Sequence, residues 1–213
     1  NGQVRFEAQH SNSDTFNSVT GNAEPSLGTE WQRYYFPIEF DAAADSGGWS
    51  IQIQMGFGTG TVDVGGLALL DFGTDTDVGA LPSGAADTDD YYGDLFTSVV
   101  GMDLPAPEFV VANSEMAVRD SDSVFAQNLN GNLTSPDLSG EGVPFSNADR
   151  FEVTSDPANS YDVQFRVDIP QDISAGDVML GVAYLRSPTD SPTASVAAVD
   201  SNDYGNHVQS NSS

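Results

Sequence analysis

The sequence predicts an all-β fold, a β-sandwich or jelly roll, and three observations lead to this prediction. Apolar and polar residues alternate with a period of two in many short segments, which is typical of strands with one buried face. Clusters of Gly, Asn, Asp, Ser and Pro separate these segments, and such residues favour turns. No amphipathic helical pattern extends beyond about two turns. Many short strands without helices indicate two packed sheets.

The alternation is clearest in residues 161–169, where apolar residues occupy every odd position and polar residues every even one. Residues 4–8 and 51–55 alternate in the same way. Further segments are rich in apolar, often β-branched or aromatic residues and lie between turn clusters, so we expect strands there too. These further predicted strands are 34–40, 61–72, 150–154, 178–186 and 195–199.

Two segments interrupt the strand pattern. Residues 73–90 are small, acidic and rich in turn-forming types, which predicts a linker or an acidic loop. Residues 91–113 are richer in apolar side chains, and they fit either a short helix or a strand that docks onto a sheet. The end of the chain, from residue 187 onwards, is polar, and we expect part of it to be mobile.

Two blocks of the sequence resemble the β-sandwich carbohydrate-binding modules attached to xylanases and related glycoside hydrolases. The first block holds EWQRYYFP at 30–37, then 51–58, then TVDVGGLALLDFG at 61–73. It is similar to the carboxy-terminal half of these modules, where a strand opens with a Trp and a later strand ends in a Gly.

The second block is similar to the amino-terminal half of the same modules. It comprises GVPF at 142–145, then 150–154, 161–167 and 173–187. In the modules a Gly-Asp turn precedes a strand that ends in an Arg, as Gly176-Asp177 precedes Arg186 here. The resemblance implies a sandwich that binds carbohydrate and carries a structural calcium.

The two halves occur in the opposite order to the modules. We therefore divide the chain into residues 1–73 (the carboxy-terminal-like block), 74–127 (an acidic linker and an apolar connecting segment), 128–199 (the amino-terminal-like block) and 200–213 (a polar tail). Three interpretations fit this order: a circular permutant, a subunit whose half completes a neighbour's sandwich, or one period of a tandem array. Closure within one chain is the simplest.

The charge restricts the partners. The chain has 32 acidic residues, six Arg and no Lys, and its net charge is −26. Without a basic patch, direct binding to nucleic acid or to an anionic membrane is disfavoured, and no apolar run is long enough for membrane insertion. Short Asp carboxylates suit a salt-adapted, halophilic surface, although an acidic secreted protein has a similar composition. Together with two glycosylation sequons, at 132–134 and 211–213, the composition favours an extracellular or cell-surface location.

Four residues are candidates for carbohydrate binding. Trp49 and Tyr184 offer flat rings that can pack on a sugar, although Trp49 can equally belong to the core. Arg186 can donate to hydroxyls or neutralise a carboxylate cluster. Gln164, like Gln52 and Gln54, lies on a polar strand face, where an amide both donates and accepts hydrogen bonds, or simply faces solvent.

Calcium is a possible cofactor. Asp71, Asp75 and Asp77 recur through a Gly-containing loop, and carboxylates at alternating positions suit Ca²⁺. The spacing does not match an EF-hand loop, and so acidic a chain produces such clusters by composition alone. A second acidic cluster lies within 87–90.

Catalysis has little support, because the two His lie near the termini and no nucleophile, phosphate-loop or zinc motif is present. We expect a non-catalytic, carbohydrate-binding β-sandwich outside the cell. The alternative is a structural subunit of an extracellular filament or surface layer, a homo-polymer assembled by exchanged strands or halves.

Overall fold

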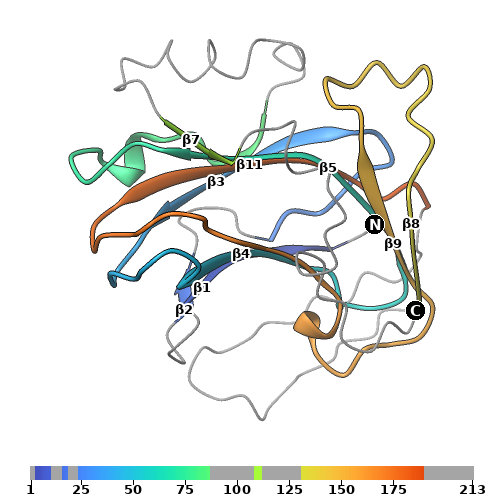
Figure 1. Ribbon diagram of the computed structural model, residues 1–213. Coiled ribbons are helices and arrows are strands. Elements are labelled where there is room, and N and C mark those ends of the chain that lie inside the picture. The colour runs from blue at the N-terminus through green and yellow to red at the C-terminus, as the bar shows by residue number, and fades with distance from the viewer. Residues whose placement is uncertain (1–2, 11–15, 19–23, 87–107, 112–130, 190–213) are drawn as a thin grey trace.

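The computed structural model describes residues 3–10, 16–18, 24–86, 108–111 and 131–189. These residues form two antiparallel sheets that pack face to face, so the predicted β-sandwich is confirmed (Figure 1). No α-helix occurs in the described ranges; the only helical turns there are η1 (Val78–Ala80) and η3 (Ser160–Asp162). Within the same ranges, no helix has the length and apolarity needed to cross a membrane.

The smaller sheet has four strands. Their order across the sheet is β10 (Gln164–Asp168), β4 (Trp49–Gln54), β1 (Arg5–His10) and β2 (Phe16–Ser18). β4 and β1 form the centre, and β10 and β2 form the two edges. All three pairings are antiparallel.

The larger sheet has seven strands. Its main path is β6 (Gly84–Ala85), β3 (Gln32–Glu39), β11 (Val178–Arg186), β5 (Gly60–Asp71), β9 (Ala148–Val153) and β8 (Gly131–Thr134). The seventh strand, β7 (Glu108–Val111), pairs with the end of β5 beyond the part that pairs with β9.

Both sequence blocks contribute to both sheets. β11 of the second block lies between β3 and β5 of the first block. β10 of the second block pairs along β4. The chain therefore closes its own sandwich in this structure. The permuted relationship to known modules and the exchange of halves between subunits stay predictions.

Aromatic pairs join the two sheets across the core. Phe6 of β1 stacks on Phe36 of β3 with ring centroids 4.0 Å apart. Phe151 of β9 meets Phe165 of β10 edge to face. Gly181 leaves room for the Phe6 ring, because a Cβ there would lie 2.5 Å from Phe6 Cζ. The alternating residues of each strand thus fill one continuous apolar layer between the sheets.

The larger sheet is also covered on its outer side. All nine residues of β11 are buried. One part of the outer side packs with Phe72 and Leu81 from the segment that carries η1. Another part, around Trp31 and Tyr184, packs with Phe145 from the connection before β9. In the smaller sheet, by contrast, the described outward side chains of β1, β4 and β10 are polar.

Candidate functional site

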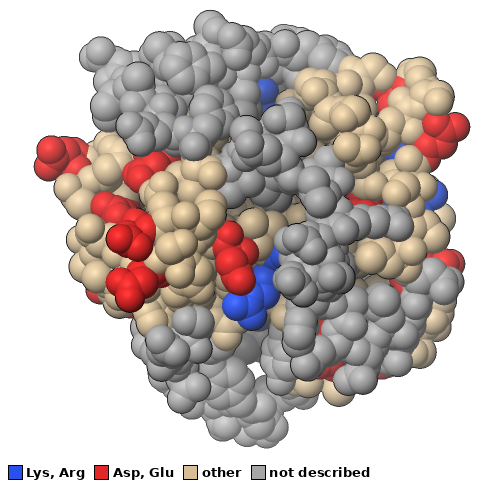
Figure 2. All heavy atoms as spheres, in the orientation of Figure 1, with Lys and Arg blue, Asp and Glu red and all other residues tan. Residues whose placement is uncertain are grey.

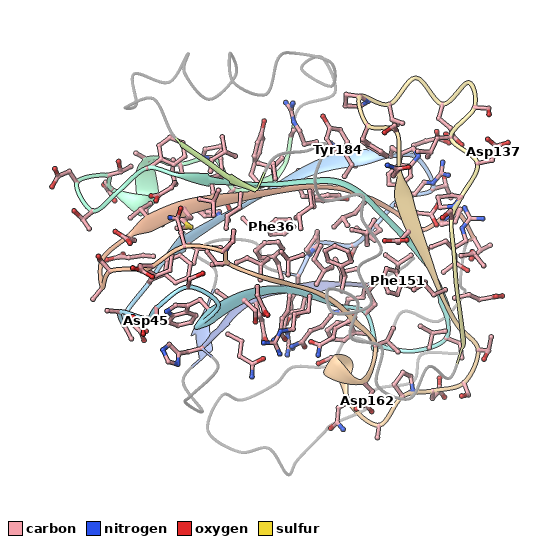
Figure 3. The ribbon with its side chains drawn as sticks, viewed as in Figure 1. Phe36, Asp45, Asp137, Phe151, Asp162 and Tyr184 are labelled. Atoms are coloured by element: carbon pink, nitrogen blue, oxygen red, sulfur yellow. The ribbon has the colours of Figure 1, made fainter. Side chains whose placement is uncertain are left out.

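The four predicted carbohydrate-binding residues lie in three different parts of the sandwich. Trp49 is in the core between the sheets, Tyr184 and Arg186 are on the outer side of the larger sheet, and Gln164 is on the outer side of the smaller sheet. In Figure 3, Phe36 and Phe151 lie between the sheets, whereas Tyr184 lies beyond the larger one. These four residues therefore do not converge on one groove.

Trp49 is a core residue. Its side chain is fully buried, its ring meets Phe40 edge to face, and its Nε1 donates to the Ala42 carbonyl at 3.0 Å. The ring has no exposed face on which a sugar could stack. Of the two alternatives that the sequence allowed for Trp49, the structure selects packing, so we do not include it in a surface site.

Tyr184 lies in a small aromatic cluster. Its ring is 5.2 Å from that of Phe145, and Phe145 meets Trp31 edge to face at 5.0 Å. All three side chains are buried. The cluster packs the connection before β9 onto the sheet, which is a structural role for these rings.

Arg186 belongs to an ionic network centred on Asp63. Arg186 Nε donates to Asp63 Oδ2 at 2.8 Å, and Arg186 Nη1 donates to Glu141 Oε2 at 2.9 Å. Arg150 donates to both Asp63 oxygens, at 2.6 and 2.7 Å, and this bonding raises the pKa of Arg150. The register places both Arg opposite Asp63 on the strands flanking β5. This arrangement matches the carboxylate-neutralising alternative for Arg186.

Gln164 belongs to a polar face on the outer side of the smaller sheet. Period-two alternation turns these side chains away from the core. We define the polar face as the outward residues of β1, β4 and β10: Arg5, Glu7, Gln9, Ser50, Gln52, Gln54, Gln164, Arg166 and Asp168. The structure thus brings together the three glutamines that the sequence placed on polar strand faces.

The strand register arranges the polar face in rows. Gln164 lies opposite Gln54, and Gln54 lies opposite Arg5. The next row has Gln52 in the centre, between Arg166 on one side and Glu7 on the other. Neighbouring side chains within a row are close enough to interact.

Hydrogen bonds link the amides on this face. Gln54 Nε2 donates to Glu7 Oε2 at 2.6 Å and to Gln52 Oε1 at 3.5 Å. Gln52 Nε2 in turn donates to Gln9 Oε1. Ser160 Oγ of η3 donates to Gln54 Oε1 at 2.7 Å, so η3 lies against one end of the face.

The polar face is close to electrically neutral. Arg5 pairs with Glu24 at 2.6 Å and with Glu7 at 3.7 Å. Arg166 pairs with Asp168 at 3.1 Å. Elsewhere the described surface in view carries many acidic and few basic side chains (Figure 2). The face is thus unlike the chain as a whole, whose net charge is −26.

Two groups on this face are withdrawn from solvent at an energetic cost, Gln164 almost completely and Glu7 in part. Gln164 is only 7% exposed, and its Oε1 accepts no hydrogen bond from the described part of the chain. A buried acceptor without a donor costs about 1–3 kcal/mol. Burial also raises the pKa of Glu7, which the nearby Arg5 partly counteracts. Glu7 and Ser160 were not among the sequence candidates, because Glu7 reads as an ordinary solvated acid and Ser160 lies in a turn.

The predicted calcium ligands have local roles in the structure. Asp71 accepts from the Gly73 backbone and from Gln171, both at 2.8 Å. Asp77 accepts from Gly79 N at 2.9 Å and so caps η1, while Asp75 is exposed. In the ranges that the structure describes, no three potential metal-ligating residues come together. A calcium site at these residues stays a prediction, and the cluster at 87–90 lies outside the described residues.

Comparisons with known proteins leave the site to be interpreted from its own geometry. No protein-family model, no curated protein and no solved structure matches this chain significantly.

Proposed function

We propose that the polar face binds a neutral, hydroxyl-rich ligand, specifically a glycan, and that the protein does so without catalysis outside the cell or at its surface. The single observation that carries the proposal is the buried Gln164 Oε1, which lacks a donor among the described residues. A sugar hydroxyl has the chemistry to supply that donor. The proposal also fits the resemblance of the two sequence blocks to carbohydrate-binding modules.

The chemistry of the face suits a sugar. Gln164 lies opposite Gln54 on the neighbouring strand, and an amide group carries both donors and an acceptor. Sugar hydroxyls also donate and accept, so they can pair with an amide in either orientation. The near balance of charge on the face favours a neutral ligand over an anionic one, which the remaining acids of the chain would repel.

The exposed side chains indicate how a ligand would approach. Gln52 and Gln54 are only 2% and 3% exposed. On the edge strand β10, however, the Arg166 side chain is 30% exposed and the Asp168 side chain 57%. A ligand would therefore reach Gln164 over β10, where Arg166 and Asp168 can contact its outer hydroxyls.

Isothermal titration against a panel of plant and cell-surface glycans tests this proposal. We expect at least one neutral glycan to bind, and we expect Gln164→Leu to weaken its affinity about tenfold, because one well-placed hydrogen bond is lost. Gln171→Leu is a matched control, because Gln171 bonds Asp71 and is not part of the polar face. The absence of binding heat for every glycan, at both low and high salt, would contradict the proposal.

A further inference from the structure

We propose that Glu7 sets the direction of the amide hydrogen bonds on the polar face, so that protonation of Glu7 regulates ligand binding there. The binding part of this inference rests on the proposed function. The direction-setting part does not, because it concerns hydrogen bonds that exist without a ligand.

The hydrogen bonds form a chain that begins at Glu7. Gln54 Nε2 donates to Glu7 Oε2 and to Gln52 Oε1. Gln52 Nε2 then donates to Gln9 Oε1. The donors therefore run outwards from Gln54, to Glu7 on one side and through Gln52 to Gln9 on the other, and this is the direction of the chain.

An ionised Glu7 imposes this direction. A carboxylate only accepts hydrogen bonds, so Gln54 must turn its nitrogen towards Glu7. Its oxygen then faces the hydroxyl of Ser160, which donates to it at 2.7 Å. Because Gln54 also donates to the Gln52 oxygen, Gln52 in turn directs its nitrogen at Gln9.

A protonated Glu7 permits the opposite arrangement. A carboxylic acid has an O–H that can donate to the oxygen of Gln54. The Ser160 hydroxyl accepts as readily as it donates, so Gln54 can turn its nitrogen to Ser160 without losing that partner. Both directions of the chain have partners at this end, which makes the network a two-state element.

The surroundings of Glu7 raise the pKa of its carboxyl group above the ordinary value for a glutamate. Its side chain is only 19% exposed, and burial disfavours the charged form, so the pKa is raised. Arg5 on the same strand opposes this effect, whereas Glu24 adds to it. β2 contributes no titratable group at the paired position, which is Ser18. The remaining charged residues on the elements packed along the face are Arg166 and Asp168 of β10 and Asp162 of η3.

The orientation of the Gln54 amide connects the hydrogen-bond chain to a bound ligand. Gln54 lies opposite Gln164 in the register, next to the acceptor that we assign to the ligand. Turning Gln54 exchanges an oxygen for a nitrogen at this position. A ligand hydroxyl that fits one arrangement then fits the other less well, so its affinity differs between the two protonation states.

Side-chain amide NMR of the protein without ligand tests the direction-setting role. We expect the Nε2 signals of Gln52 and Gln54 to shift together as the pH changes, with one midpoint above the ordinary glutamate value of 4.5. Glu7→Gln should abolish the shift, and Glu24→Gln should keep it, because it removes an equal charge outside the amide chain. Signals that do not move in the wild type, or that still titrate together in Glu7→Gln, would overturn this role.

Titration of the glycan from the binding panel tests the regulation. We expect its affinity to change about fivefold or more across the same midpoint, to be constant with pH in Glu7→Gln, and to vary as in the wild type in Glu24→Gln. Binding with a flat pH profile in the wild type overturns the regulation but leaves the proposed function intact. Absence of binding at every pH overturns the proposed function and the regulation together, while the amide titration still decides the direction-setting role.

Discussion

At the scale of single residues, Asp63 links three neighbouring strands of the larger sheet by ion pairs. Its side chain is fully buried, and both oxygens bond to Arg150 and Arg186 from the strands on either side. The chain has only six basic side chains for 32 acids, yet two of them pair with this one carboxylate. This ion pair is expensive to break, because Arg186 would stay charged in a poorly solvated place with Glu141 as its one remaining bonded carboxylate among the described residues.

We predict that Asp63→Asn lowers the free energy of unfolding by about 3–5 kcal/mol, because Arg186 and Arg150 then lose their shared counter-charge. Urea denaturation followed by circular dichroism measures the change. Asp168→Asn is the matched control, since Asp168 also pairs with an Arg but is 57% exposed, and it should cost no more than about 1 kcal/mol. Equal losses in the two variants would contradict the anchoring role.

We also predict that Glu7 makes stability depend on pH. Burial raises the pKa of Glu7 in the folded protein, so its contribution to stability is fully present below the unfolded value and is lost as the pH rises through the folded value. Glu7→Gln should therefore be stabilised relative to the wild type near pH 8, and the difference should shrink towards pH 4. Denaturation at several pH values checks this. A difference that stays constant with pH, or grows as the pH falls, would be inconsistent with the buried carboxylate.

The sequence predicts the face on which a side chain lies better than its partners. Gln52, Gln54 and Gln164 were placed on polar strand faces by alternation, and they lie together because β4 and β10 are neighbours. For Arg186 the sequence allows either a sugar or a carboxylate as the bonding partner, because Asp63, the partner in the structure, is 123 positions away in the chain. The contact between Tyr184 and Phe145 could not be predicted either, because Phe145 comes from a distant turn.

At the scale of secondary structure, prediction works best where local pattern and tertiary contacts agree. Residues 178–186 form the predicted strand, β11, without any change of boundary. Residues 161–169 were expected to form one strand, but the first part belongs to the turn η3, and the strand β10 spans only Gln164–Asp168. The side chain of Asp162 accepts from the Asn159 backbone, and this local bond favours the turn over the strand.

The very short strands carry no periodic signal. β6 and β2 are two and three residues long, which is too short for alternation to show. Their pairing depends on the position of β3 and β1, the strands that they extend. The predicted strand at 195–199 lies outside the described residues.

We predict that Gly65→Ala loosens the packing between β5 and the connection before β9. A Cβ at Gly65 would lie 2.4 Å from Phe145 Cε2, so the ring must shift from its present position against Trp31 and Tyr184. Overpacking of this kind costs about 1–3 kcal/mol, which thermal or urea denaturation can measure. The double variant Gly65→Ala, Phe145→Leu, in which a smaller side chain replaces the ring, should recover part of the lost stability.

Gly28→Ala is the matched control for this prediction, because nothing lies within 4 Å of a Cβ at that position. It should change stability by no more than about 0.5 kcal/mol. If Gly65→Ala were as mild as Gly28→Ala, the contact between Gly65 and Phe145 would not limit the packing of this strand.

At the scale of the whole molecule, fold and charge have separate origins. The sandwich follows from alternation and from the aromatic pairs between the sheets, and its prediction from the sequence was confirmed. The net charge of the chain is −26, and the acidic side chains of the described residues are scattered over the face in view in Figure 2. The chain has only six Arg and no Lys for its 32 acids, so the mutual repulsion of the excess negative charges opposes the compact state.

We therefore predict that salt stabilises the whole molecule. Raising sodium chloride from 0.1 M to 1 M shortens the Debye length from about 10 Å to about 3 Å, which screens the repulsion. The free energy of unfolding should rise by more than about 1 kcal/mol, above the usual effect of one surface substitution. Replacing the exposed Asp45, Asp75 and Asp156 with Asn should flatten this rise, whereas sucrose at matched osmolarity should not reproduce the difference between variant and wild type. An unfolding free energy that is independent of salt, or a triple variant with an unchanged slope, would mean that repulsion among the surface acids does not limit the stability of the fold.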